Sequence, residues 1–190
     1  MLEIKLQEAL KDIQWQPTAI PLVTRGKRLQ AGKLEPRYVI LHCIGFLRGR
    51  ALSILTEDPN VSVTAHFFID QQGECVALAP LDKIAHHCGE SYWQGQKNLN
   101  PFAIGIELHA PDYAGAISHP DQLDWNQLDE YTDAQLITLI KLLNYLVKRF
   151  SIESQNILYH SDIAPGRKTD PGSTFPGKLF AKLGFGLKNR

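Results

Sequence analysis

The sequence lacks the features that mark membrane, secreted and nucleic-acid-binding proteins. Its 190 residues carry 20 basic and 20 acidic side chains, so the net charge is zero and no overall field attracts nucleic acid or anionic lipid. No apolar run approaches the length of about eighteen residues that a membrane-spanning helix needs. The N-terminus lacks the cationic start and continuous apolar run of a signal peptide. We therefore expect no nucleic-acid partner and no membrane insertion.

Cysteine is also scarce. Only Cys43, Cys75 and Cys88 are present, and their odd number and wide spacing argue against a framework of disulfides. Free thiols are typical of a reducing compartment. The sequence therefore predicts a cytoplasmic protein.

What is present is ordinary for a globular protein, with 44% hydrophobic and 21% charged residues. A chain of this length forms one core without needing to divide. We expect a single domain over residues 1–190, with an N-terminal helix and a proline-punctuated lead-in over 1–36 and the catalytic core over 37–185.

Hydrophobic periodicity predicts a sheet packed by helices. Helices are expected over 2–14, 132–150 and 176–183, and strands over 38–41, 65–69, 75–78, 103–108 and 157–159. The glycine- and arginine-rich stretch 43–62 is expected to be a loop with at most one helical turn. Thr132 and Gln135 have the spacing of a capping box at the start of the longest helix. The expected fold class is α/β, with a central mixed β-sheet flanked by helices.

Three side chains have the types and positions of a metal site. His42 and His160 each follow a short apolar strand, and Asp170 comes after a turn rich in proline and glycine. Zinc hydrolases typically use three nitrogen or oxygen ligands and leave a fourth position for water. The alternatives are a structural or surface role for each histidine and simple turn formation by Asp170, Pro171 and Gly172.

Glu107 breaks the pattern of an otherwise apolar strand. A buried carboxylate is costly unless it is paired or used, and burial raises its pKa toward the range of a general base. The alternative is a salt bridge at the end of the strand. In the same strand, Gly105 indicates a close approach of backbone or ligand.

Five motifs occur in the order typical of one known family. They are Val39-Ile40-Leu41-His42, Val63-Thr64-Ala65-His66-Phe67, Ala85-His86-His87-Cys88-Gly89, Ile104-Gly105-Ile106-Glu107-Leu108 and the run from His160 to Gly172. With these motifs the chain resembles the zinc-dependent N-acetylmuramoyl-L-alanine amidases, which share the peptidoglycan-recognition protein fold. The resemblance is greatest to the branch that trims cytosolic anhydromuramyl peptides during cell-wall recycling.

The resemblance implies one Zn²⁺ per chain, bound by His42, His160 and Asp170. It also implies that Glu107 is the acid/base and that Lys168 stabilises the oxyanion. The implied reaction is cleavage of the amide bond between (1,6-anhydro-)N-acetylmuramic acid and L-alanine in muropeptides.

Substrate contacts are expected from residues before the Glu107 strand. They are His87, Trp93, Asn98 and Asn100. His87 matches a histidine that lines the cleft in this family, whereas Trp93 has the alternative of packing its own loop. Close members of the family carry arginine where Asn98 stands, and Lys97 beside it offers a replacement cation for the peptide carboxylate.

Two other functions remain open at this point. Some proteins of this fold bind muropeptides without cleaving them, and others act on the intact cell wall. The preference for anhydro or ordinary muramic acid, the preferred peptide length and the oligomeric state are left open by the sequence.

Overall fold

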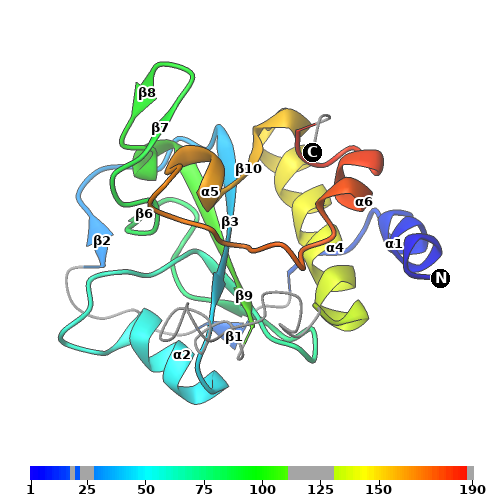
Figure 1. The fold of residues 1–190 in the computed structure, drawn as a ribbon, viewed down its shortest axis with the longest axis horizontal. Coiled ribbons are helices and arrows are strands. Elements are labelled where there is room, and N and C mark those ends of the chain that lie inside the picture. Colours follow the sequence, from blue (N-terminus) through cyan, green and yellow to red (C-terminus); the bar gives the residue numbers. More distant parts are fainter. Residues whose placement is uncertain (18–19, 22–27, 111–130, 188–190) are drawn as a thin grey trace.

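A computed structural model describes residues 1–17, 20–21, 28–110 and 131–187, so part of the proline-punctuated lead-in lies outside the described residues. A six-stranded sheet runs through the centre of the molecule (Figure 1). In spatial order its strands are β1 (Ile20–Pro21), β5 (Cys75–Ala77), β4 (Phe67–Ile69), β9 (Ala103–His109), β3 (Tyr38–Ile44) and β10 (Ile157–Tyr159). Among the described strands of this sheet, only β4 and β5 pair antiparallel; the other neighbouring strands are parallel. The expected mixed sheet is confirmed.

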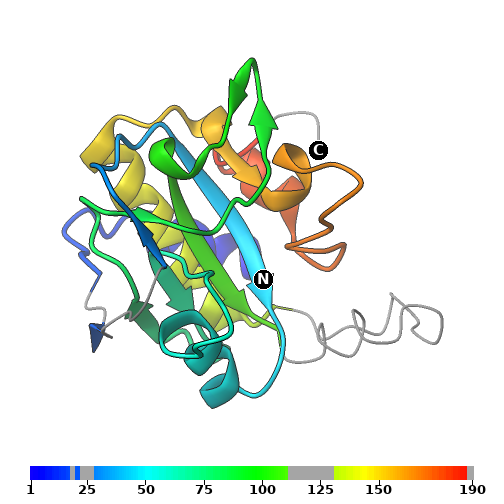
Figure 2. The ribbon, with the colours of Figure 1, turned by 90° about the vertical axis from the view of Figure 1, so that its left-hand side faces the viewer.

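Two small ribbons lie outside the central sheet. β2 (Leu29–Gln30) pairs with β6 (Ile84–Ala85), and β7 (Tyr92–Trp93) pairs with β8 (Gln96–Lys97). Strands of two residues are too short to show a periodicity, and the sequence did not predict them. The β7–β8 hairpin lies beside the short helix α5 (His160–Ile163), as Figures 1 and 2 both show.

Helices cover the sheet unequally. The long helix α4 (Asp133–Phe150) lies on one side with α1 (Leu2–Leu10) and α6 (Gly177–Lys182), and α2 (Arg48–Thr56) lies on the other (Figure 1). Short 3₁₀ turns, η1 (Asn100–Phe102) and η3 (Ser154–Asn156), lead into β9 and β10. Within the described residues, no helix combines the length and apolar character needed to span a bilayer.

The start of α4 differs in one detail from the prediction. The Thr132 hydroxyl accepts a hydrogen bond from the Gln135 backbone N–H at 3.1 Å, as an N-cap should. The Gln135 side chain does not return to the cap; its amide donates instead to the carbonyls of Ile69 and His109. The predicted N-cap is therefore confirmed, but the predicted return bond from the Gln135 side chain is wrong, because this side chain is buried against the sheet.

Two boundaries also differ. α1 ends at Leu10 rather than at residue 14, and Ile13 is 70% exposed, so the last predicted turn has no core to pack on. The expected loop at 43–62 contains the nine-residue helix α2. Ala51 and Leu55 form its buried stripe, but the glycine and arginines around them concealed the pattern.

The two long central strands separate the core from the opposite face of the sheet. Side chains alternate along a strand. Val39 and Leu41 of β3 belong to the main hydrophobic core with α4, whereas Ile40 belongs to a separate cluster. His42 therefore lies on the face that α4 does not cover.

Candidate functional site

His42 lies inside β3 rather than at its end. The strand continues to Ile44, so the expectation that it ends at His42 is wrong. In the register of β3 and β9, His42 lies opposite Glu107. The sheet therefore presents an imidazole and a carboxyl group next to each other on the face away from α4.

The junction of β10 and α5 positions His160. β10 pairs parallel with β3, and its last residue, Tyr159, lies opposite Leu41. α5 begins at His160, and the Asp162 carboxylate accepts a hydrogen bond from the Tyr159 backbone N–H at 2.6 Å. This bond stabilises the change from strand to helix. His160 is thereby held beside His42, and it is buried.

The loop after α5 brings Asp170 to the same place. The Ser161 backbone N–H donates to the Asp170 carbonyl at 3.1 Å. On the other side of Asp170, the Tyr131 hydroxyl donates to the Pro171 carbonyl at 2.6 Å. These two bonds fasten the loop around the buried Asp170 side chain.

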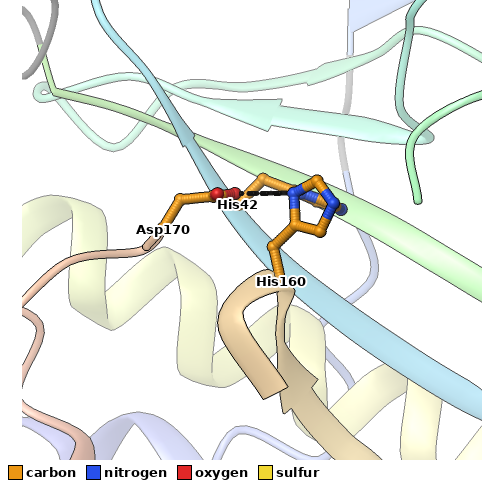
Figure 3. A group of neighbouring side chains, drawn as sticks. All are labelled: His42, His160 and Asp170. Carbon is orange, nitrogen blue, oxygen red and sulfur yellow. Dashed lines mark hydrogen bonds and ion pairs between the residues drawn. The ribbon is translucent and has the colours of Figure 1, made fainter. Parts of the chain in front are cut away.

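The polar atoms of the three residues converge on one point (Figure 3). The two Nδ1 atoms of His42 and His160 are 2.9 Å apart, and Asp170 Oδ2 lies 3.2 Å from the first and 3.0 Å from the second. Ligands of a tetrahedral zinc with bonds of 2.0–2.1 Å are about 3.3 Å apart. Two imidazole nitrogens and a carboxylate oxygen in this arrangement could hold a divalent metal ion.

The protonation states of His42 and Asp170 at neutral pH are those that metal binding requires. Burial lowers the pKa of His42 to about 4, although the hydrogen bond to Asp170 opposes this effect. Burial would raise the pKa of Asp170, but hydrogen bonds with His160 and His42 hold it well below its usual range. At neutral pH the metal-free cluster therefore contains a neutral His42 and an ionised Asp170, which are the forms that bind metals.

Glu107 is the second unusual group on this face. Its Oε2 atom is buried and has no hydrogen-bond partner in the part of the chain that the structure describes. Burial raises the pKa of Glu107 to about 8, and the nearby negative charge of Asp170 acts in the same direction. No ion pair holds Glu107 among the described residues, which argues against the salt-bridge alternative.

A cavity of about 350 Å³ opens over these groups, lined by His42, His87, Glu107, His160, Lys168 and Asp170. Lys168 is exposed on the turn before Asp170. A second cavity of about 550 Å³ lies between the β7–β8 hairpin and α5, and Arg167 lines both cavities. The two cavities together give room for a substrate that extends from the buried cluster to the hairpin.

Lys97 and Asn98 line the larger cavity. Trp93, also expected to contact substrate, is partly buried and packs on the cluster of Ile40 and Leu158. Its indole Nε1 is buried and finds no hydrogen-bond partner within residues 1–17, 20–21, 28–110 and 131–187. Asn98 is therefore at a surface that a substrate can reach, whereas the packing of Trp93 agrees with the alternative role for this residue.

The other two expected substrate contacts use their polar atoms within the protein. His87 lines the smaller cavity but is buried, and its ring nitrogens lie 3.0 Å from His42 Nε2 and 3.1 Å from the Ala103 carbonyl oxygen. Asn100 is buried, and its Oδ1 accepts from the backbone N–H groups of His87 and Cys88. Contact of either residue with substrate stays a prediction.

The sequence did not single out Arg167. Its guanidinium donates to the carbonyls of Cys88 at 2.9 Å and Glu90 at 2.5 Å, which connects the turn before Asp170 to the segment before β7. The available signal was its place beside Lys168 in the motif His160–Gly172. In the structure, the partners of this second cation are backbone carbonyls.

Comparison with known proteins gives a consistent result. A family profile described as N-acetylmuramoyl-L-alanine amidase matches residues 32–173. The 1,6-anhydro-N-acetylmuramyl-L-alanine amidase AmpD of Enterobacter cloacae is 33% identical over 159 residues, which cover 84% of this chain and 77% of the relative.

Two solved structures have the same fold. The crystal structure of a selenomethionine derivative of AmpD superposes with a TM-score of 0.69 at 30% identity, covering 90% of this chain and 97% of that one. The amidase AmiD from E. coli, in complex with anhydro-N-acetylmuramic acid-L-Ala-D-gamma-Glu-L-Lys, gives a TM-score of 0.68 at 28% identity. That match covers 83% of this chain and 61% of AmiD.

Proposed function

The chain belongs to the N-acetylmuramoyl-L-alanine amidase family, and from this premise we propose that it is a zinc hydrolase of muropeptides. The bond cleaved is the amide between (1,6-anhydro-)N-acetylmuramic acid and L-alanine. One Zn²⁺ is held by His42, His160 and Asp170. The observation that carries the proposal is the convergence of their three ligand atoms next to the buried Oε2 of Glu107, which has no hydrogen-bond partner among the described residues.

The donor set suits zinc in both number and type. Catalytic zinc sites use three protein ligands and keep a fourth position for water or substrate. Among the described residues the cluster contains three such ligands, and the cavity above it is open to a substrate. Zinc supplies two things when bound in such a site: it acidifies water and it polarises the amide carbonyl.

Glu107 moves the protons. Its carboxylate accepts a proton from the attacking water at Oε2, while the water oxygen bonds to the lactyl carbonyl carbon. The carboxylic acid then returns that proton to the L-alanine nitrogen as the carbon–nitrogen bond breaks. The raised pKa of about 8 suits an acid that must hold and release a proton near neutrality, and a neighbouring cation would favour the carboxylate.

Lys168 supplies positive charge at the mouth of the smaller cavity. Negative charge grows on the carbonyl oxygen as water attacks. A cation already placed at that oxygen stabilises the transition state without rearrangement. The products are a muramic acid with a free lactyl carboxylate and a peptide with a free amino terminus.

We propose that the peptide part of the substrate binds in the larger cavity. Lys97 is the cation best placed there to pair with a peptide carboxylate, because Asn98 has no charge. AmpD relatives are named for the 1,6-anhydro sugar, and AmiD was solved with an anhydromuramyl tripeptide. We therefore place this chain among enzymes that act on released anhydromuropeptides. Cys43, Cys75 and Cys88 are reduced cysteines rather than halves of disulfides, which supports a cytosolic location for this reaction.

Mass spectrometry of anhydro-N-acetylmuramyl-tripeptide incubated with the zinc-loaded protein tests the proposal. We expect free tripeptide and anhydro-N-acetylmuramic acid, and no products after chelation of the metal. Uncut substrate in the presence of fully metallated protein would overturn the enzymatic function and favour a muropeptide sensor. Parallel incubation with ordinary muramyl-tripeptide measures the sugar preference, and comparable cleavage of intact cell wall would contradict the recycling role.

A further inference from the structure

A layer of hydrogen bonds lies behind the proposed ligands, and no role assigned so far uses it. His87 Nδ1 lies 3.0 Å from His42 Nε2, the ring nitrogen that faces away from the proposed metal position. His160 Nε2 lies 3.0 Å from the Cys88 carbonyl oxygen. The outer nitrogen of each histidine ligand thus meets a group from the same dipeptide, His87–Cys88.

The hydrogen bond to Ala103 determines which nitrogen of His87 carries the proton. A carbonyl oxygen only accepts, so His87 Nε2, 3.1 Å from the Ala103 oxygen, must be the donor. A second proton on Nδ1 would leave an unpaired cation in a buried position, which is costly. His87 Nδ1 is therefore an acceptor, and His42 Nε2 must donate to it. When a metal ion is bound, His42 Nδ1 gives up its hydrogen bond to Asp170 and offers a lone pair at the metal position.

The Cys88 carbonyl has the same effect on His160. Because this oxygen only accepts, His160 Nε2 carries a proton, and when a metal ion is bound His160 Nδ1, which otherwise pairs with Asp170 at 3.0 Å, is the nitrogen that offers a lone pair. Both ligand histidines are thus held in the Nε2–H tautomer, one by a side chain and the other by a backbone carbonyl. The dipeptide selects the nitrogen that each ligand offers.

Asn100 holds the dipeptide in place. Its single Oδ1 atom accepts from the His87 backbone N–H at 3.1 Å and from the Cys88 backbone N–H at 2.8 Å. One buried amide oxygen therefore fixes both of the residues that orient the histidine ligands. This contact gives Asn100 a definite role in the interior.

Gly105 and His66 support the His87 ring from below. A Cβ atom built on Gly105 would lie 2.7 Å from both Cγ and Nδ1 of His87, so only glycine lets the ring lie against β9. The Gly105 backbone N–H donates to His66 Nδ1 at 3.0 Å, and His66 Nε2 lies 3.1 Å from the Lys83 carbonyl oxygen. His87 is thereby held from both the sheet side and the Asn100 side.

We propose that His87 and the Cys88 carbonyl, held by Asn100, are positioning groups that set the tautomers of His42 and His160 for metal binding. The proposal rests on the zinc site of the proposed function. It makes His87 a determinant of metal affinity rather than a substrate contact. Outer groups of this kind typically change metal affinity by about 10–100-fold when removed.

Zinc affinity, measured by competition with a chromogenic chelator, tests the role of His87. His87→Leu removes the acceptor for His42 Nε2–H at similar volume, and we expect affinity about 10–100-fold weaker than in the unmodified protein. His87→Asn places an amide oxygen close to the position of Nδ1 and should recover most of the loss. His86→Leu is the matched control, because the neighbouring histidine makes no contact with the ligands in the described residues; its affinity should be unchanged.

Two results of the titration would overturn the proposal. Equal zinc affinity in His87→Leu and the unmodified protein would mean that the hydrogen bond does not contribute. Equal loss in the leucine and asparagine variants would assign His87 a packing role. If the unmodified protein bound no zinc, the proposed function would fail first, and that outcome is visible before any variant is compared.

Nitrogen-15 NMR of the unmodified, zinc-loaded protein gives a test that needs no variant to fold. Long-range proton–nitrogen correlations distinguish the two neutral tautomers of histidine and its charged form. We expect the Nε2–H tautomer for His87 and a hydrogen-bonded Nε2–H for both His42 and His160. A Nδ1–H or doubly protonated His87 in the metal-loaded protein would sink the proposal.

Discussion

His42 and Glu107 lie opposite each other in the register of β3 and β9, with both side chains on the face of the sheet away from α4. This pairing places the proposed metal ligand and the proposed proton carrier on two adjacent parallel strands. The backbone hydrogen bonds of the central sheet therefore maintain the spacing between them.

Glu107→Gln should strongly lower turnover and leave metal binding intact. The amide has the shape of the acid but cannot accept a proton, and we expect kcat to fall by about 10²–10⁴-fold. Zinc content by atomic absorption should stay at one per chain. Loss of zinc in this variant would instead assign Glu107 to the metal's coordination sphere.

Lys168→Met should lower kcat by about 10²–10³-fold, because it removes the cation that opposes charge on the carbonyl oxygen. Lys168→Arg retains the positive charge and serves as the matched control, with activity between the two. Zinc content and the free energy of unfolding should be unchanged, since Lys168 is exposed. A methionine variant with normal kcat would exclude the proposed role.

The metal-free protein should lose stability as the pH falls, in part because of His66. Burial lowers the pKa of His66 to about 4, below its ordinary value of 6.5. Between these values the unfolded chain binds more protons than the folded one, so stability rises with pH in this window and is lost on acidification. The full effect of one such group is about 3 kcal/mol at pH 4.

Urea unfolding at several pH values between 4 and 8 measures this dependence. His66→Asn keeps an acceptor near the Gly105 N–H and removes the titrating ring, so its stability should change less between pH 6.5 and 4. Glu107 and His42 titrate in both proteins, and their contributions cancel in the comparison. Parallel curves for the two proteins would show that His66 is not buried in the neutral form.

Gly105→Ala should destabilise the fold and weaken zinc binding together. The new methyl group would lie 2.7 Å from the His87 ring, and the overpacking should cost about 1–3 kcal/mol in the free energy of unfolding. Gly49→Ala in α2 is the matched control, because its new Cβ meets no atom within 4 Å. Its stability should be unchanged or slightly higher. Equal effects of the two substitutions would contradict the close approach at Gly105.

The parts of the structure that the sequence could predict have a local cause. Val39–Leu41 and Ile157–Tyr159 are short, mainly apolar runs that are each followed by a histidine, and such runs form buried parallel strands. The two histidines were therefore candidates for one metal site, and their Nδ1 atoms are 2.9 Å apart. The glycine at 105 indicated a close approach of backbone or ligand, whereas the group that lies against it is a side chain, the His87 ring.

The parts that the sequence could not predict depend on contacts between distant segments. Gln135 has the correct spacing for a capping box, but burial against the sheet gives its amide two better acceptors. The acceptor of the His87 N–H is the carbonyl of Ala103, and no local pattern connects these two residues. Asn100 could be recognised as polar and close to the site, but the direction of its side chain depends on the tertiary fold.

The alternation of side chains along β3 has a practical consequence for protein engineering. Val39 and Leu41 can be exchanged for other aliphatic residues to tune thermal tolerance, because they point into the layer beneath α4. The candidate site lies on the opposite face of the sheet, where His87, Asn100 and Gly105 hold its side chains in place. Thermal stability and catalytic activity can thus be optimised in separate libraries of variants of the same strand.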